Sequence, residues 1–311
     1  MHIGSDMAME LRHFRYFVAV AEEGHVTRAA ERLGMQQPPL SQRIRFIEEE
    51  LGAQLFLRRA RGVELTQAGW AFLEVARSML RQYESAYEVT RRAARGQTGR
   101  LCVGATPTSA FHPIVPMAIR SFRDEFSDVS LTLEERLPAE LIQGLQDEKI
   151  DVAFLRAETF EEAGLVVRFL LSEPMIVALP ADHTLARAKR VIALRDLARE
   201  TFVVYARQTG PAFFDATMAA CRSAGFSPTL GQEAPRVTSA LNLVAAGLGV
   251  CVVPASVRRM AMEGIDYRTL KGSAQLKAPI NIVSRRGDPA AVVRNFLSSV
   301  RRTKGALPDA L

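Results

Sequence analysis

Residues Thr27 to Leu51 read TRAAERLGMQQPPLSQRIRFIEEEL, a pattern that predicts two short helices joined by a tight turn. Thr27 is a residue type that caps helices, and Gly34 is the type that ends them. Pro38 and Pro39 mark the start of the second helix, because a first helical turn needs no backbone donor and proline presets φ there. The stretch therefore predicts a helix-turn-helix.

The second helix is predicted to have one apolar and one polar face. Leu40, Ile44 and Ile47 recur at helical spacing and should pack against the first helix. The opposite face carries amides, a hydroxyl and cations, which a recognition helix uses to contact base edges and phosphates in a major groove. These residues alone leave an ordinary polar face on a helical hairpin as the alternative. The candidate DNA-contacting residues of this helix are Gln37, Pro38, Ser41, Gln42, Arg43 and Arg45.

Residues 55–69 (LFLRRARGVELTQAG) predict a small β-hairpin after the second helix. Arg58, Arg59 and Arg61 lie at or near its tip, where they would contact the sugar-phosphate backbone as the wing of a winged helix-turn-helix. The alternative is a solvated basic turn. Upstream, the run LRHFRYFVAVAEEG predicts a further helix that ends at Gly24.

A long helix is predicted from Gln67 to Arg95, capped by Thr66. Its apolar residues recur at spacings of three and four, which is typical of a helix that pairs with a copy of itself. We therefore expect a dimer, in which two recognition helices meet two half-sites of a palindrome.

Composition sets broad limits on the function. The chain has 311 residues, enough for two or three domains, and its net charge of +6 weakly favours an anionic partner. Cys102, Cys221 and Cys251 are far apart, so free thiols are a simpler interpretation than a disulfide switch or a metal site. Neither a membrane span nor a signal peptide is visible, which predicts a cytoplasmic protein without contact to membranes. The first eight residues look like an upstream extension.

Beyond a hinge at GQTGR (residues 96–100), strand-like and helix-like runs alternate, which predicts a parallel α/β sheet. We expect two lobes with a crevice at the carboxyl ends of their strands, where open α/β sheets bind ligands. The predicted divisions are a winged helix-turn-helix DNA-binding domain at 9–66, a dimerisation linker helix at 67–95, the hinge at 96–100 and an effector-binding domain at 101–311, with lobe I at about 101–171 and 275–302 and lobe II at about 172–274.

Hydroxyl groups and backbone N–H groups follow the first strand of this region, as they would in an anion site at a helix N-terminus. Arg156 follows a later strand and would supply the counter-charge, and Phe213 would form an apolar wall in the second lobe. For each hydroxyl taken alone, simple helix capping is the alternative. The candidate effector-binding residues are Thr106, Pro107, Thr108, Ser109, Arg156, Gln208, Thr209 and Phe213.

The chain resembles the LysR-type transcriptional regulators over nearly its full length. The resemblance rests on ELRHFRYFVAVAEEGHVTRAAERLGMQQPPLSQRIRFIEEELGAQLFLRRARGVELTQAG and on the later NLVAAGLGVCVVPAS. It implies an N-terminal all-α winged helix-turn-helix, a long linker helix, and a C-terminal α/β two-lobed effector domain similar to periplasmic binding proteins. It also implies a dimer of dimers on inverted-repeat promoter DNA, activation through RNA polymerase, and a small-molecule inducer.

The opening residues and the paired prolines look most like the subgroup that controls aromatic-compound degradation and responds to muconate, benzoate or chlorocatechol products. Gln36 stands where serine is common in the family, and Pro138 stands where muconate-responsive members place a hydroxyl against the ligand. We therefore expect a generic aromatic or ring-cleavage carboxylate as effector. The alternatives are a sensor like a solute-binding protein and a redox-responsive regulator. No catalytic motif, metal-ligand spacing or cofactor motif is present, so an enzyme is not expected.

Overall fold

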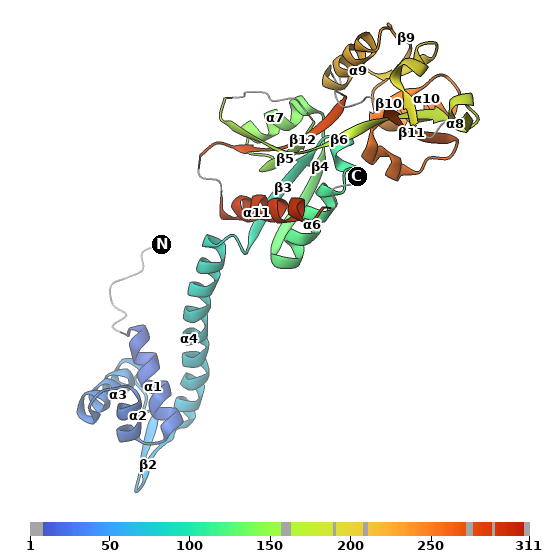
Figure 1. The fold of residues 1–311 in the computed structure, drawn as a ribbon. Helices are drawn as coiled ribbons and strands as arrows, with labels where there is room; N and C mark the ends of the chain where they lie inside the picture. Colours follow the sequence, from blue (N-terminus) through green and yellow to red (C-terminus); the bar gives the residue numbers. More distant parts are fainter. Residues whose placement is uncertain are drawn as a thin grey trace. The chain divides into compact units, whose positions relative to one another are not determined.

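The computed structural model describes residues 9–156, 163–188, 191–207, 211–271, 276–287 and 290–307, and it divides after Arg92 into two compact units (Figure 1). We call them the N-terminal unit and the C-terminal unit. Within the described ranges, no helix combines the length and the apolar character that a membrane-spanning segment needs.

The N-terminal unit is built from helices and one hairpin around a single apolar core. Its elements are α1 (Leu11–Glu23), α2 (Val26–Arg32), α3 (Gln37–Leu51), β1 (Phe56–Arg59), β2 (Gly62–Leu65) and α4 (Gln67–Ala94). Phe17, Leu40 and Ile47 are fully buried in the core. The ring of Phe17 lies 5.2 Å from that of Phe56 and 4.8 Å from that of Phe72, measured between centroids, so α1, the hairpin and α4 share this core.

The helix ends of this unit follow the sequence pattern, with one correction. Gly24 takes a left-handed conformation (φ 61°) and ends α1 as predicted, and the proline-marked start of α3 is confirmed. Thr27 was expected to cap α2, but this prediction is wrong. The helix begins earlier, and the imidazole of His25 accepts the backbone N–H of Thr27 at 3.2 Å.

The hairpin is confirmed, and it is fixed against the end of α1. Strands β1 and β2 pair antiparallel, with Arg58 opposite Val63. The backbone N–H of Val63 donates to the carbonyl of Gly24 at 2.9 Å. Gly62 has a φ of +143°, and a Cβ atom there would lie 2.2 Å from the Gly24 carbonyl oxygen. Only glycine permits this close approach, which holds the wing beside the helices.

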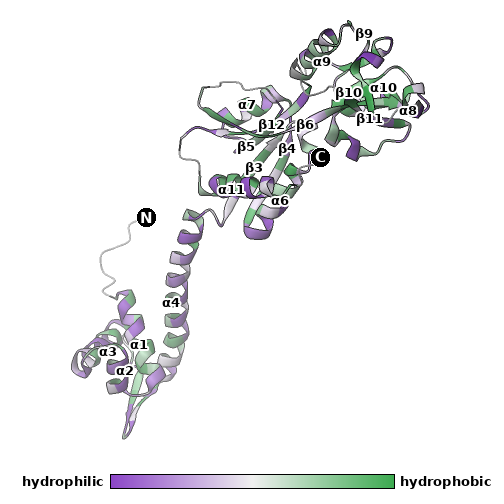
Figure 2. Cartoon of the chain, in the orientation of Figure 1, coloured by the Kyte–Doolittle hydropathy of each residue, from purple (hydrophilic) through white to green (hydrophobic). Residues whose placement is uncertain are grey.

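Helix α4 leaves the core of the N-terminal unit after its first turns. The backbone N–H of Gly69 donates to the hydroxyl of Thr66 at 2.9 Å, which confirms the predicted cap. Among its residues, Leu73 and Ala76 are buried, whereas Val75 and Met79 are 53% and 41% exposed. Figure 2 shows α4 as largely hydrophilic with separate hydrophobic positions. A row of exposed apolar side chains therefore runs along this helix.

The first lobe of the C-terminal unit has the predicted parallel βαβαβ arrangement. We define lobe I as β3 (Gly99–Ala105), α5 (Pro107–Ala110), α6 (Ile114–Glu125), β4 (Val129–Glu135), α7 (Pro138–Gln146), β5 (Val152–Leu155) and α11 (Ala291–Gly305). Strand β3 lies between β4 and β5 and is parallel to both. The ring of Phe296 on α11 packs against those of Phe122 and Phe154, at centroid distances of 5.3 and 6.3 Å, and closes one face of the sheet.

The main sheet of the second lobe is continuous with that of the first, and an apolar cluster lies on each of its faces. We define lobe II as α8 (Thr184–Ala188), β7 (Val191–Ala193), η1 (Leu194–Leu197), β8 (Thr201–Tyr205), α9 (Pro211–Ser223), β9 (Thr229–Ala234), α10 (Val237–Ala245), β10 (Cys251–Pro254), η2 (Ala255–Met260) and β11 (Ile265–Lys271). Figure 2 shows α10 and the neighbouring strand β10 as hydrophobic.

Two long strands run between the lobes, and here the predicted parallel pattern fails. Strand β6 (Leu165–Pro180) pairs antiparallel with β12 (Lys277–Arg285). Its second half pairs with β10 and β11 of lobe II. The sheet is therefore mixed, and β6 continues from one lobe into the other.

Candidate functional site

The polar face of α3 lies exposed, as a recognition helix requires. Leu40, Ile44 and Ile47 are buried. The amide of Gln37 donates to the hydroxyl of Ser41 at 2.8 Å, one helical turn further along. Of the predicted DNA-contacting residues on α3, Ser41 is half-buried, and the exposed ones are Gln37, Pro38, Gln42, Arg43 and Arg45.

The three wing arginines are all exposed, but their charges differ in availability. Arg59 forms an ion pair with Glu64 across the hairpin, with 2.9 Å between Nε and Oε2. Arg58 and Arg61 form no ion pair with the residues that the structure describes. These two guanidinium groups are therefore available to phosphate oxygens.

In the C-terminal unit, two of the predicted hydroxyls face the protein interior. The hydroxyl of Thr106 donates to that of Ser109 at 2.9 Å, and Ser109 Oγ lies 2.9 Å from the carbonyl of Phe154 on β5. Pro107 occupies the first position of α5. These bonds connect the turn after β3 to the neighbouring strand. Thr108 is 8% exposed, and its backbone carbonyl accepts a hydrogen bond from Arg156 at 2.9 Å.

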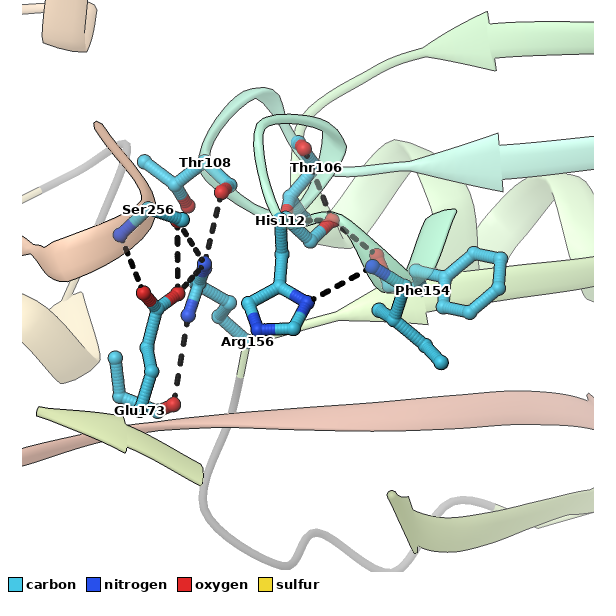
Figure 3. Close-up of polar contacts among 10 residues, drawn as sticks. Thr106, Thr108, His112, Phe154, Arg156, Glu173 and Ser256 are labelled. Atoms are coloured by element: carbon cyan, nitrogen blue, oxygen red, sulfur yellow. Dashed lines mark hydrogen bonds and ion pairs between the residues drawn. The ribbon is translucent and has the colours of Figure 1, made fainter. Parts of the chain in front are cut away.

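Arg156 is buried and its charge is already balanced within the chain (Figure 3). Its Nη2 atom pairs with the carboxylate of Glu173 and lies 2.9 Å from the carbonyl of Thr108. Its Nη1 atom donates to the carbonyl of Ala278 at 3.4 Å. Burial lowers the pKa of Arg156, an effect that Glu173 opposes. The positive charge of Arg156 was predicted from the sequence to pair with an anionic effector. In this structure Glu173 neutralises that charge.

Glu173 connects both lobes. Besides Arg156, which follows β5 of lobe I, it accepts the backbone N–H of Ser256 at 2.5 Å and the hydroxyl of the same residue at 2.9 Å. Ser256 belongs to η2 of lobe II. Sequence reasoning missed Glu173 and Ser256, because they lie 17 and 100 residues from Arg156 and no local motif joins them.

His112 is a second buried group that the sequence did not single out. Its Nδ1 atom accepts the backbone N–H of Ile114 at the start of α6, at 3.1 Å. Burial lowers the pKa of His112, with the charge of Glu173 acting in the opposite direction. Burial therefore favours the neutral imidazole, which accepts a free backbone N–H at the start of α6.

In lobe II, the ring of Phe213 lies 5.9 Å from that of Tyr205, beside the carboxyl end of β8. Gln208 and Thr209, the other two predicted effector contacts in this lobe, lie outside the described residues. The structure therefore places one of the three predicted residues of this lobe.

Cys221 and Cys251 have the properties of buried, unreactive thiols. Burial raises the pKa of Cys221 to about 11 and that of Cys251 to about 12, which keeps both protonated. A reactive redox sensor needs a lowered thiol pKa, so these two cysteines do not favour the redox-responsive alternative. The described residues include no cluster of histidine, cysteine or carboxylate side chains that could hold a metal ion.

Comparison with known proteins relates both units to one family. The family described as bacterial regulatory helix-turn-helix protein, lysR family, matches residues 11–70, and the LysR substrate binding domain matches residues 94–304. The regulator TfdS of Cupriavidus pinatubonensis is 38% identical over 96% of this chain and 99% of its own length. The regulator BudR of Raoultella terrigena is 35% identical over 93% of this chain and 99% of its own length.

A solved structure extends the likeness to the fold. Full-length CbnR bound to its target DNA is 30% identical, with a TM-score of 0.82 over 95% of this chain and 100% of that one. The predicted winged helix-turn-helix and α/β effector domain are confirmed by these matches. The chain therefore belongs to the LysR family of non-enzymatic, DNA-binding transcriptional regulators that carry a domain for a small-molecule effector.

Proposed function

We propose that the chain binds inverted-repeat promoter DNA as a dimer of dimers, in the cytoplasm, and that a small carboxylate bound between its lobes changes how it acts on RNA polymerase. The observation that supports DNA contact most directly is the exposed polar face of α3, together with two wing arginines that pair with no acidic group in the described part of the chain. CbnR, which has the same fold, has been solved on its target DNA. In this proposal α3 reads base edges and the wing contacts phosphates.

The double variant Arg58→Ala/Arg61→Ala is expected to bind all DNA sequences more weakly. Each phosphate contact that is lost removes about one released counterion, so the slope of log K against log salt should fall by about 2 in magnitude for each subunit whose wing contacts the DNA. Fluorescence anisotropy with the native promoter and with random duplex, at several salt concentrations, measures both quantities.

Arg59→Ala is the matched control, since its charge is already paired with Glu64. It should change the salt slope less than either neighbouring substitution does. Gln42→Ala, on α3, should instead relax the preference at one or two base pairs and leave the salt slope unchanged. If the double variant kept the full salt slope, the wing would not be part of the interface.

The effector site is proposed at the turn after β3, around Thr106, Pro107, Thr108 and Ser109, opposite Phe213 of lobe II. Because Thr106 and Ser109 bond to the interior, Thr108 is the residue of this turn that we assign to the ligand. Effector binding then shifts the balance between conformations through its different affinity for each.

Thr108→Ala should raise the effector concentration needed for half-maximal response about tenfold, by removing one hydrogen bond to the ligand, and leave operator affinity unchanged. A thermal-shift screen with aromatic acids and ring-cleavage dicarboxylates identifies the ligand first, because a compound that binds only the folded protein raises its melting temperature. Thr303→Ala removes a buried hydroxyl on α11 that bonds to Ser299, and it should not alter the response. If Thr108→Ala and Thr303→Ala needed the same effector concentration for half-maximal response, the effector site would not lie at this turn.

A further inference from the structure

Three buried polar atoms in the described part of the C-terminal unit have no hydrogen-bond partner: Nε of Arg156 and the hydroxyl oxygens of Tyr205 and Tyr267. A buried polar group without a partner destabilises the folded state, and native proteins contain few of them. A group of such atoms is explained if a bound molecule completes their hydrogen bonds.

The two tyrosines contribute to the same apolar cluster of lobe II, the one under α10. Strand β6 is flanked by β10 and β11, so that Ala178 lies opposite Cys251 on one side and opposite Tyr267 on the other. Directly paired residues direct their side chains to the same face. Tyr205, at the carboxyl end of β8, packs in the same apolar cluster. Ala178 and Cys251, which belong to the same cluster, have small side chains.

Arg156 reaches the lobe II side of this cluster, because its Nη2 atom lies 3.3 Å from the hydroxyl of Ser256, two residues after β10. The charge of Arg156 lowers the pKa of Tyr205, but burial has the larger effect and raises that pKa well above its ordinary value, with Cys251 and Tyr267 also raising it. Burial likewise raises the pKa of Tyr267. Both phenols therefore keep their protons at neutral pH and can donate them in hydrogen bonds.

The unused atoms have matching chemistry. The guanidinium of Arg156 uses Nη1 and Nη2 for Glu173, Thr108 and Ala278, which leaves Nε–H as its donor without a partner. Together with two phenolic O–H groups, this makes three donors that need acceptors. An ionised carboxylate is an acceptor-only group with two oxygens and about four lone-pair sites.

We propose that Nε of Arg156 and the hydroxyls of Tyr205 and Tyr267 together receive a carboxylate group of the effector. This inference rests on the proposed function, and it extends the effector site from the turn after β3 to the apolar face under α10. The ion pair with Glu173 stays intact in the bound state, so Arg156 is shared between an internal and an external carboxylate.

The experiment uses the full-length protein and the single and double variants Tyr205→Phe and Tyr267→Phe. Acetate, benzoate and cis,cis-muconate are the probes, and benzamide is the uncharged counterpart of benzoate. Without a probe, each substitution should raise the melting temperature by about 2–4 °C, because it removes an unsatisfied buried hydroxyl. Affinity for the carboxylate that binds best should fall about tenfold per hydroxyl removed, measured by calorimetry. Benzamide should not stabilise the unmodified protein.

Thr303→Val is the control, because its buried hydroxyl already donates to Ser299 at 2.9 Å. It should lower the melting temperature and leave carboxylate affinity unchanged. The inference is overturned if the double tyrosine variant binds carboxylates as tightly as the unmodified protein, or if no probe stabilises the unmodified protein. If Thr108→Ala weakens binding while the tyrosine variants do not, the proposed effector site stands and only this extension of it is wrong.

Discussion

Glu173→Ala is expected to destabilise the C-terminal unit by about 3–5 kcal/mol, because it leaves the guanidinium of Arg156 charged and uncompensated in the interior. The side chains of Arg156 and Glu173 are only 2% and 3% exposed, so water cannot replace the lost partner. Ser256 would lose its acceptor at the same time, for both its backbone N–H and its hydroxyl. Thermal or urea unfolding followed by circular dichroism measures the loss.

Two further variants separate this explanation from a general loss of packing. Replacing both partners, as in Arg156→Met/Glu173→Met, should recover most of the stability, since no buried charge then remains unpaired. Glu134→Ala breaks the exposed pair with Arg136, which has 2.7 Å between Nη2 and Oε2, and should cost less than about 1 kcal/mol. A double variant as unstable as Glu173→Ala would contradict the charge-based explanation. Arg156→Ala is for the same reason unsuitable as a test of effector binding.

Val75→Asp/Met79→Asp is expected to convert the protein into monomers and to lower its affinity for a two-half-site operator at least about a hundredfold. Both side chains are exposed on α4 and lie one helical turn apart, in a row that continues to Tyr83 and Tyr87. A helix with one exposed apolar row buries it by pairing, and two carboxylates in that contact would oppose the pairing. In a dimer, binding of one half-site holds the second subunit close to the other half-site, which raises its effective concentration there. A monomer lacks this gain, so its affinity for the whole operator falls.

Light scattering after size-exclusion chromatography gives the mass, and anisotropy compares duplexes with one and two half-sites. Ser78→Asp/Ser85→Asp adds the same charge at polar positions of α4 and should stay oligomeric. Val75→Asp/Met79→Asp should bind a duplex with a single half-site as tightly as the unmodified protein does, since α3 and the wing are unchanged. A dimer that persists in Val75→Asp/Met79→Asp would show that α4 does not hold the copies together.

The sequence predicted best those features that local chemistry determines. Pro38 defines the start of α3, Gly24 the end of α1, and Thr66 the cap of α4, and each of these depends on backbone bonds within a few residues. The cap of α2 was missed because His25 is a less common capping residue than the threonine two positions later.

Features that depend on distant residues were not predictable in this way. A single arginine after a strand is consistent with a ligand contact, and nothing near Arg156 in the sequence indicates that Glu173 already pairs with it. The extent of β6 is hard to predict, because the charged Arg168 interrupts the apolar run before Glu173. Its antiparallel pairing with β12, more than 100 residues later, depends on tertiary contacts. The hydrophobic periodicity of the sequence does not specify which strands pair.

The unbroken course of β6 through both lobes limits how an effector can act. Lobes that are joined by flexible loops swing open and shut about a few backbone torsions. Here a hydrogen-bonded ribbon of β6 and β12 leads into lobe II, so one lobe turns against the other only by coiling that ribbon about its own length. We therefore expect an effector held beside this ribbon to change its twist, spread over many residues, rather than to close the lobes about a hinge.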